Sequence, residues 1–92
     1  MTIIAELEKV ILDRRSTPRK GSYTCHLFEK GIDEIVKKVG EESVEVILAG
    51  LKQNDTRLAE ETADLVYHLL VLLAERGVPW AAVEAELVAR RK

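Results

Sequence analysis

Four carboxylates recur at one spacing in two neighbouring segments of this chain. Glu42 and Glu45 lie three residues apart in one predicted helix, and Glu61 and Asp64 lie three residues apart in the next. Side chains at i and i+3 share one face of a helix. Acids grouped in this way repel one another unless a cation lies among them, and Mg²⁺ prefers such oxygen ligands. The pattern predicts a magnesium site, and a metal held by carboxylates indicates phosphate chemistry.

The acidic pairs also have a simpler interpretation as solvated side chains. Pairs at this spacing occur by chance on charged helices, and Glu60 beside Glu61 could simply face water. Both pairs, however, adjoin strongly apolar helix faces, where an unpaired charge would be costly. We therefore favour the metal site, whose expected ligands are Glu42, Glu45, Glu61 and Asp64.

Apolar residues recur at helical spacing in every long segment, and no segment alternates for long enough to form a strand. The sequence predicts an all-α fold of four or five helices in a single domain, residues 1–92. We expect long helices at about residues 3–15, 31–51, 55–76 and 79–90, and a short helical turn at 26–29. If the second and third long helices pack antiparallel, the two acidic pairs face each other in the core of the bundle.

Apolar residues occupy more than one face of two of these helices. In the helix expected at residues 31–51, Val44 and Leu48 form a second apolar surface on the far side of the acids. The next helix is apolar almost all round from Leu65 to Leu73, which requires burial on every side. In so short a chain such burial predicts a second copy, and hence a homodimer. His68, within that apolar segment, is expected to play a supporting or structural role.

Charge and composition exclude several classes of partner. A net charge of −2 gives no basic face of the kind that nucleic-acid-binding proteins show. The one basic run, residues 14–20, is either a solvated loop or a phosphate-binding loop. Residues 1–12 lack the features of a signal peptide, and the longest apolar stretch is too short to span a bilayer. A single cysteine, Cys25, can form no internal disulfide. We expect a cytoplasmic protein with no nucleic-acid or membrane partner.

The segments around the acids resemble one family of enzymes. ExxE on one helix and ExxD on the next is typical of the all-α MazG-type nucleotide pyrophosphohydrolases. GSYTCHLFEKG (residues 21–31), KKVGEESVEV (37–46) and ADLVYHLLVLL (63–73) are similar to the phosphoribosyl-ATP pyrophosphohydrolases of histidine biosynthesis. The resemblance extends from the first predicted helix to the last and departs little, with Cys25 where a small residue is expected. It implies a MazG-like bundle completed by dimerisation.

The resemblance also implies an activity, the Mg²⁺-dependent hydrolysis of phosphoribosyl-ATP to phosphoribosyl-AMP and pyrophosphate, the second step of histidine biosynthesis. Breaking an α,β-phosphoanhydride requires that the triphosphate oxygens be neutralised and that water be presented in line with the leaving group. Mg²⁺ would provide the neutralising charge. Glu41 or Glu45 would orient or deprotonate the water, and we favour Glu41 as the base.

Candidate substrate-binding residues flank the acids. Lys38 lies one turn before Glu42 on the same side of the helix, where it could reach a phosphate oxygen. Lys37 is less well aimed, and either lysine could instead be solvated. Ser22 and Tyr23 begin a hydroxyl-rich segment, which the resemblance suggests as a contact for phosphate or ribose.

Two other functions remain open from the sequence. A MazG-type house-cleaning enzyme, acting on non-standard or pyrimidine nucleoside triphosphates, would use the same acids. A non-enzymatic helical interaction module would explain the apolar faces and predicts that neither activity nor stability depends on Mg²⁺. The number of metal ions, the phosphorus attacked and the sharing of active sites between subunits stay undetermined.

Overall fold

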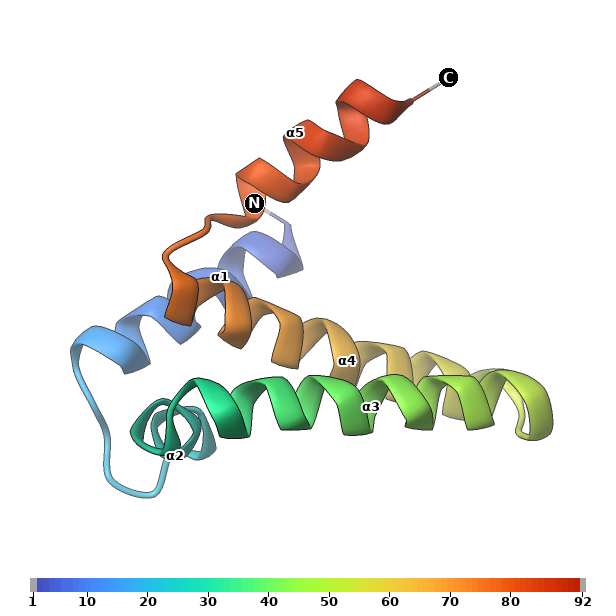
Figure 1. The fold of residues 1–92 in the computed structure, drawn as a ribbon, viewed down its shortest axis with the longest axis horizontal. Coiled ribbons are helices and arrows are strands. Elements are labelled where there is room, and N and C mark those ends of the chain that lie inside the picture. The colour runs from blue at the N-terminus through green and yellow to red at the C-terminus, as the bar shows by residue number, and fades with distance from the viewer. Residues whose placement is uncertain (1, 92) are drawn as a thin grey trace.

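The computed structural model describes residues 2–91, which form five helices and no strand. The helices are α1 (Ile3–Ser16), α2 (Tyr23–Lys30), α3 (Ile32–Lys52), α4 (Asp55–Arg76) and α5 (Trp80–Arg90). Helices α3 and α4 run side by side in opposite directions, as Figure 1 shows. The all-α prediction is confirmed, and each long helix begins and ends within one residue of its expected bounds. The helical turn expected at residues 26–29 is instead an eight-residue helix.

Side-chain caps explain where three of the helices begin. Thr2 Oγ1 accepts from the Ala5 backbone N–H at 3.2 Å, and Asn54 Oδ1 accepts from the Arg57 N–H at 2.9 Å. Ser22 Oγ accepts from the Cys25 backbone N–H at 3.2 Å in the same way. Satisfying these free donors favours helix initiation. The Ser22 cap therefore starts α2 one turn earlier than the apolar pattern alone suggested.

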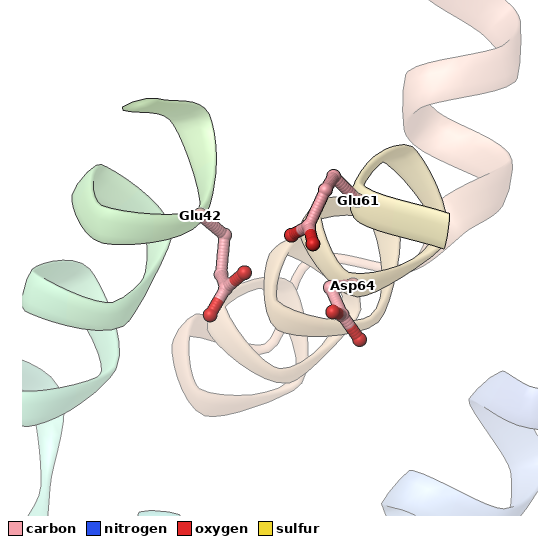
Figure 2. Close-up of side chains that lie close together, drawn as sticks. All are labelled: Glu42, Glu61 and Asp64. Atoms are coloured by element: carbon pink, nitrogen blue, oxygen red, sulfur yellow. The ribbon is translucent and has the colours of Figure 1, made fainter. Parts of the chain in front are cut away.

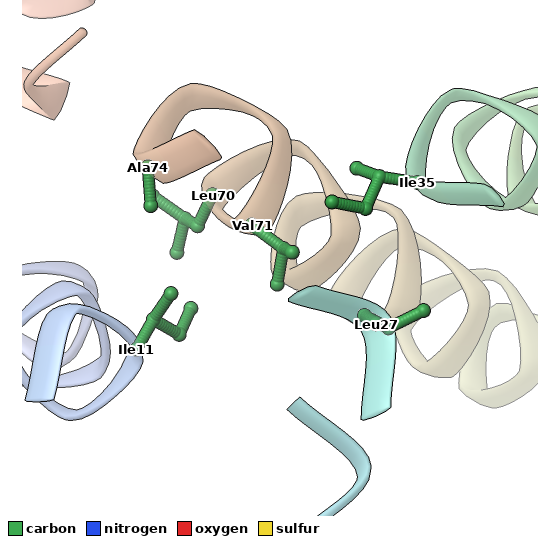
Figure 3. Close-up of a cluster of buried hydrophobic side chains, with 6 residues drawn as sticks. All are labelled: Ile11, Leu27, Ile35, Leu70, Val71 and Ala74. Atoms are coloured by element: carbon green, nitrogen blue, oxygen red, sulfur yellow. The ribbon is translucent and has the colours of Figure 1, made fainter. Parts of the chain in front are cut away.

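The hydrophobic core lies where α1, α2 and the N-terminal half of α3 meet the C-terminal half of α4 (Figure 3). Each of these helices contributes at least one buried side chain, and the cluster consists of Ile11, Leu27, Ile35, Leu70, Val71 and Ala74. Ile4 and Leu7 of α1 pack against it, whereas Val10 of the same helix is 46% exposed. The core thus fixes one end of the α3–α4 pair.

Helix α5 extends away from the other helices (Figure 1), and none of its residues is buried. Its first turn is anchored, because the Trp80 backbone N–H donates to Glu8 Oε2 at 2.7 Å and the Trp80 side chain packs against the core. No single helix of the described chain has both the length and the apolar composition needed to cross a bilayer. Helices α4 and α5 meet that test only as a pair, and they are bent by 110° where they join.

The apolar faces predicted on α3 and α4 differ in their burial. Every residue of α4 from 65 to 73 is buried or half-buried within this one chain. On α3, by contrast, large apolar side chains remain exposed at four positions with helical spacing. These are Val44, Ile47, Leu48 and Leu51, which are 53%, 57%, 40% and 75% exposed. The described chain therefore buries or half-buries the apolar segment of α4 but leaves an apolar face of α3 uncovered.

Candidate metal and substrate site

Three of the four predicted metal ligands come together between α3 and α4. Glu42 on α3 and Glu61 and Asp64 on α4 each offer a carboxylate oxygen, and these oxygens all lie within 4.8 Å of one another. Figure 2 shows the carboxylates of Glu42 and Glu61 facing each other across the two helices. Mg²⁺–oxygen bonds of about 2.1 Å place opposite ligands of one ion about 4.2 Å apart, close to this separation. This acid cluster therefore fits a small divalent cation in both ligand chemistry and spacing.

Glu61 is the most buried carboxylate of the acid cluster, with 7% of the residue exposed, whereas Glu42 is half-buried and Asp64 is exposed. Burial of an ionised carboxylate is costly unless a cation accompanies it. Arg57, one turn earlier on α4, supplies that cation through an ion pair between its Nη2 and Glu61 Oε1. Its Nη1 also donates to Glu60 Oε1 at 2.6 Å.

Lys38 provides a second cation on the α3 side of the acid cluster. Its Nζ lies 3.4 Å from Glu41 Oε1 and 3.8 Å from Glu42 Oε1. Desolvation by itself would lower the pKa of Lys38, but the Tyr23 phenol and the two carboxylates outweigh it and raise the pKa above its ordinary value. Lys38 is therefore charged at neutral pH and lies beside the acids on α3, while its role in binding phosphate stays a prediction.

The remaining predicted acids and Lys37 lie at the edge of this arrangement. Glu45 is exposed and does not belong to the group of three oxygens. Glu41 is exposed too, and its carboxylate pairs with Lys38. Lys37 is exposed on the same helix. The roles of Glu45 as ligand or base, and of Glu41 as base, stay predictions.

A hydrogen-bonded chain connects α2 to the acid cluster. The Tyr23 hydroxyl lies 3.1 Å from His68 Nε2, and His68 Nδ1 lies 2.7 Å from the backbone carbonyl oxygen of Asp64. Beside it, the hydroxyls of Thr24 and Tyr67 form a second hydrogen bond between the same two helices. His68 is buried, with 5% exposed, whereas Tyr23 is 48% exposed. The N-terminus of α2 is thereby held against the turn of α4 that carries Asp64.

A hollow of about 560 Å³ lies on the outer side of Tyr23. Arg19 and Lys20 of the basic run, together with Ser22 and His26, are among the residues that line it. Cys25, a free cysteine, is buried at this hollow, where its Sγ accepts from the Arg19 backbone N–H at 3.2 Å and its thiol donates to the carbonyl oxygen of Arg14 in α1 at 3.4 Å. The candidate substrate-binding residues Ser22 and Tyr23 therefore adjoin a cationic surface.

Sequence reasoning missed the ion pair of Arg57 and the position of His26 in this arrangement, whereas Arg19 belongs to the basic run that it identified. Arg57 could have been found, because it precedes Glu61 by four residues and so shares its helix face. The proximity of Tyr23 to His68 had no local signal, since 45 residues separate them in the chain. Only the packing of α2 against α4 brings these side chains together.

Comparison with known proteins identifies the family. A model of the phosphoribosyl-ATP pyrophosphohydrolase family matches residues 4–91. A phosphoribosyl-ATP pyrophosphatase from Lactiplantibacillus plantarum is 54% identical over 90 residues, covering 98% of this chain and 85% of the relative. The enzymes of the same name from Listeria welshimeri and Pelotomaculum thermopropionicum are 53% and 54% identical over 96% and 98% of this chain, and over 84% and 92% of their own lengths. The resemblance seen in the sequence is thus confirmed, and this chain belongs to the phosphoribosyl-ATP pyrophosphohydrolase family.

Proposed function

We propose that this protein hydrolyses phosphoribosyl-ATP to phosphoribosyl-AMP and pyrophosphate, with Mg²⁺, as a cytoplasmic enzyme of histidine biosynthesis. The observation that carries the proposal is the acid cluster of Glu42, Glu61 and Asp64, in a chain about half identical to proteins named phosphoribosyl-ATP pyrophosphatase. Its three carboxylates from two helices, flanked by cations, suit a triphosphate with its accompanying metal better than they suit a neutral ligand.

The proposed roles follow from the position of each side chain. Glu42, Glu61 and Asp64 would hold Mg²⁺, with Glu45 as the further predicted ligand. When bound, Mg²⁺ neutralises charge on the phosphate oxygens and so lowers the barrier to attack on phosphorus. Lys38 lies next to this cluster and would bind a phosphate oxygen.

An exposed carboxylate at the edge of the acid cluster would activate the attacking water. Glu41 and Glu45 are both exposed on α3, and either carboxylate could orient or deprotonate the attacking water. We favour Glu41, whose Oε1 lies 3.4 Å from Lys38 Nζ and so adjoins the proposed phosphate contact. Replacing Glu41 by Gln should then lower kcat by about 10²-fold or more with little change in the Mg²⁺ requirement.

Pyrophosphate release from phosphoribosyl-ATP, measured with and without Mg²⁺, tests this function. Asp64→Asn and Glu45→Gln should each abolish release while leaving the helical circular dichroism unchanged, because each substitution removes a charge without altering shape. Asp55→Asn is the matched control, since Asp55 is exposed on the same helix as Asp64 and lies outside the acid cluster. Full turnover by Asp64→Asn at saturating Mg²⁺ would refute the ligand assignment. Faster turnover of another nucleoside triphosphate would favour a house-cleaning enzyme instead.

We also propose that two copies associate through the uncovered face of α3. Val44, Ile47, Leu48 and Leu51 follow the i, i+3, i+4, i+7 pattern of a helix face that packs against another helix. All four are exposed in the single chain. An apolar surface of this kind is unusual on a monomer of 92 residues. A second copy offers the same apolar stripe and would cover it by a twofold contact.

A further inference from the structure

The hydrogen bonds of His68 determine which of its nitrogens carries hydrogen. Its Nδ1 lies 2.7 Å from the carbonyl oxygen of Asp64. A carbonyl oxygen can only accept, so Nδ1 must be the donor. In the neutral imidazole the other nitrogen, Nε2, then has no hydrogen and can only accept. The backbone of α4 thereby fixes the tautomer of His68.

This tautomer dictates the direction of the next hydrogen bond. The Tyr23 hydroxyl lies 3.1 Å from Nε2, so it must donate its one hydrogen to His68. The phenolic oxygen then has only lone pairs left to offer to anything else. Tyr23 is 48% exposed and lines the hollow beside the basic run, so a ligand can reach it. To such a ligand, Tyr23 is an acceptor and not a donor.

A hydrogen-bond acceptor at this position can pair only with those parts of a nucleotide that donate a hydrogen bond. Phosphate oxygens also accept only, so they cannot bond to a phenol whose hydrogen is committed to His68. Sugar hydroxyls can donate. Two hydrogen bonds and one imidazole ring link the Tyr23 oxygen to the backbone carbonyl of Asp64, the residue whose carboxylate belongs to the acid cluster. Because that cluster would engage the triphosphate, the sugar within reach of Tyr23 is the ribose that carries the triphosphate.

We infer that Tyr23 accepts a hydrogen bond from the 2′- or the 3′-hydroxyl of that ribose and so favours substrates that carry this hydroxyl over substrates that lack it, with His68 as the positioning residue. The inference rests on the proposed function and assigns to one atom of the site one part of the substrate. The sequence left open whether Tyr23 contacts phosphate or ribose, and the inference assigns Tyr23 to the ribose.

The experiment measures discrimination between sugars and not activity alone. Phosphoribosyl derivatives of ATP, 2′-deoxy-ATP and 3′-deoxy-ATP are compared by kcat/KM at one fixed pH. The unmodified protein should prefer the ribose substrate over one of the deoxy substrates by about three- to tenfold, the effect of one neutral hydrogen bond. Tyr23→Phe should hydrolyse that pair equally well, because the acceptor is gone.

A matched control and a rescue variant complete the test. Tyr67→Phe removes a neighbouring phenolic hydroxyl, bonded to Thr24, and should keep the discrimination of the unmodified protein. His68→Gln retains an amide oxygen that can accept from Tyr23 and should preserve more discrimination than His68→Leu, which offers no acceptor.

Each outcome either supports or refutes the assignment of Tyr23 to a ribose hydroxyl. Equal use of all three substrates by the unmodified protein, or unchanged discrimination in Tyr23→Phe, would overturn the assignment while leaving the proposed hydrolysis intact. Failure of the unmodified protein to hydrolyse any of the three would instead refute the proposed function. Circular dichroism confirms that each variant is folded before its kinetics are compared.

Discussion

Arg57 donates from Nη2 to Oε1 of Glu61, the most buried carboxylate of the acid cluster. The guanidinium thus neutralises an acid that two further carboxylates approach to within 4.8 Å. The guanidinium lies on the exposed side of α4, where Arg57 also pairs with Glu60. Any other cation that binds Glu61 must compete with this ion pair, so Arg57 opposes metal binding.

Removal of this competitor should tighten metal binding. In Arg57→Gln we expect the Mg²⁺ concentration for half-maximal pyrophosphate release to fall about two- to fivefold, the effect of one ion pair whose arginine is exposed. Arg90→Gln is the control, because it breaks a similar ion pair with Glu86 on α5 and does not adjoin the acid cluster. A higher Mg²⁺ requirement in Arg57→Gln would contradict this competition.

Substitution of Gly40 tests whether substrate approaches the backbone of α3 closely. It lies inside the helix between Lys38 and the acids, and nothing in the described chain lies within 4 Å of the position that a Cβ would take. Gly40→Ala should therefore raise the free energy of unfolding by about 0.5–1 kcal/mol through helix propensity alone. Thermal denaturation checks this, with Gly50→Ala as the comparison, where the nearest side-chain atom is an ordinary 3.9 Å away.

The two glycine variants should differ only if something beyond the chain contacts Gly40. If Gly40→Ala and Gly50→Ala are stabilised equally and KM is unchanged, substrate does not contact the backbone at Gly40. A stabilised Gly40→Ala with raised KM, alongside a normal Gly50→Ala, means that substrate approaches the helix closely at this point. Lower stability of Gly40→Ala than of the unmodified protein contradicts the propensity argument.

Helical periodicity was sufficient to predict the four long helices and the approach of three of the four predicted ligands across α3 and α4. Glu42, Glu61 and Asp64 converge because a short connection forces the two helices to be antiparallel, and the i, i+3 spacing then places the acids on facing sides. The same reasoning did not predict the position of Glu45. The rotation of α3 about its axis depends on how Ile35 packs into the core, and in the structure it leaves Glu45 on the exposed side of the helix, as it does Val44 and Leu48.

Contacts between distant segments carried no signal in the sequence. Tyr23 and His68 meet only because α2 packs across α4 and α3, and α2 itself was predicted as a single turn. The hydroxyl-rich segment was suggested as a substrate contact through family resemblance, but the direction of its hydrogen bond required the His68 geometry. Local patterns thus predicted the elements, whereas the side-chain network depended on tertiary packing.

The exposed stripe on α3 leads to a prediction about association. Leu48→Lys places a charge in the middle of the proposed contact, where its desolvation is unfavourable. We expect this variant to sediment as a monomer at micromolar concentrations at which the unmodified protein is a dimer. Gln53→Lys adds the same charge beyond the end of α3 and should remain dimeric. If the unmodified protein is itself a stable monomer, the proposed contact is wrong.

Tyr67 leads to a prediction about alkaline stability. Burial raises the pKa of Tyr67 above its ordinary value of about 10, although the hydrogen bond with Thr24 partly offsets the shift. The neutral phenol is therefore favoured in the folded state. A group whose pKa is raised on folding contributes stability below its unfolded pKa and loses that contribution as the pH rises through its folded pKa. The stabilising effect of Tyr67 should be complete below about pH 10 and decline above it.

Denaturant unfolding as a function of pH measures this contribution. Tyr67→Phe should lower the free energy of unfolding at neutral pH by about 0.5–1.5 kcal/mol, because the part-buried Thr24 hydroxyl loses its partner. The difference from the unmodified protein should shrink above about pH 10. Thr24→Val removes the same hydrogen bond but keeps the phenol, so it should retain the alkaline decline that Tyr67→Phe lacks. Parallel pH profiles for the unmodified protein and Tyr67→Phe would show that this phenol does not govern alkaline unfolding.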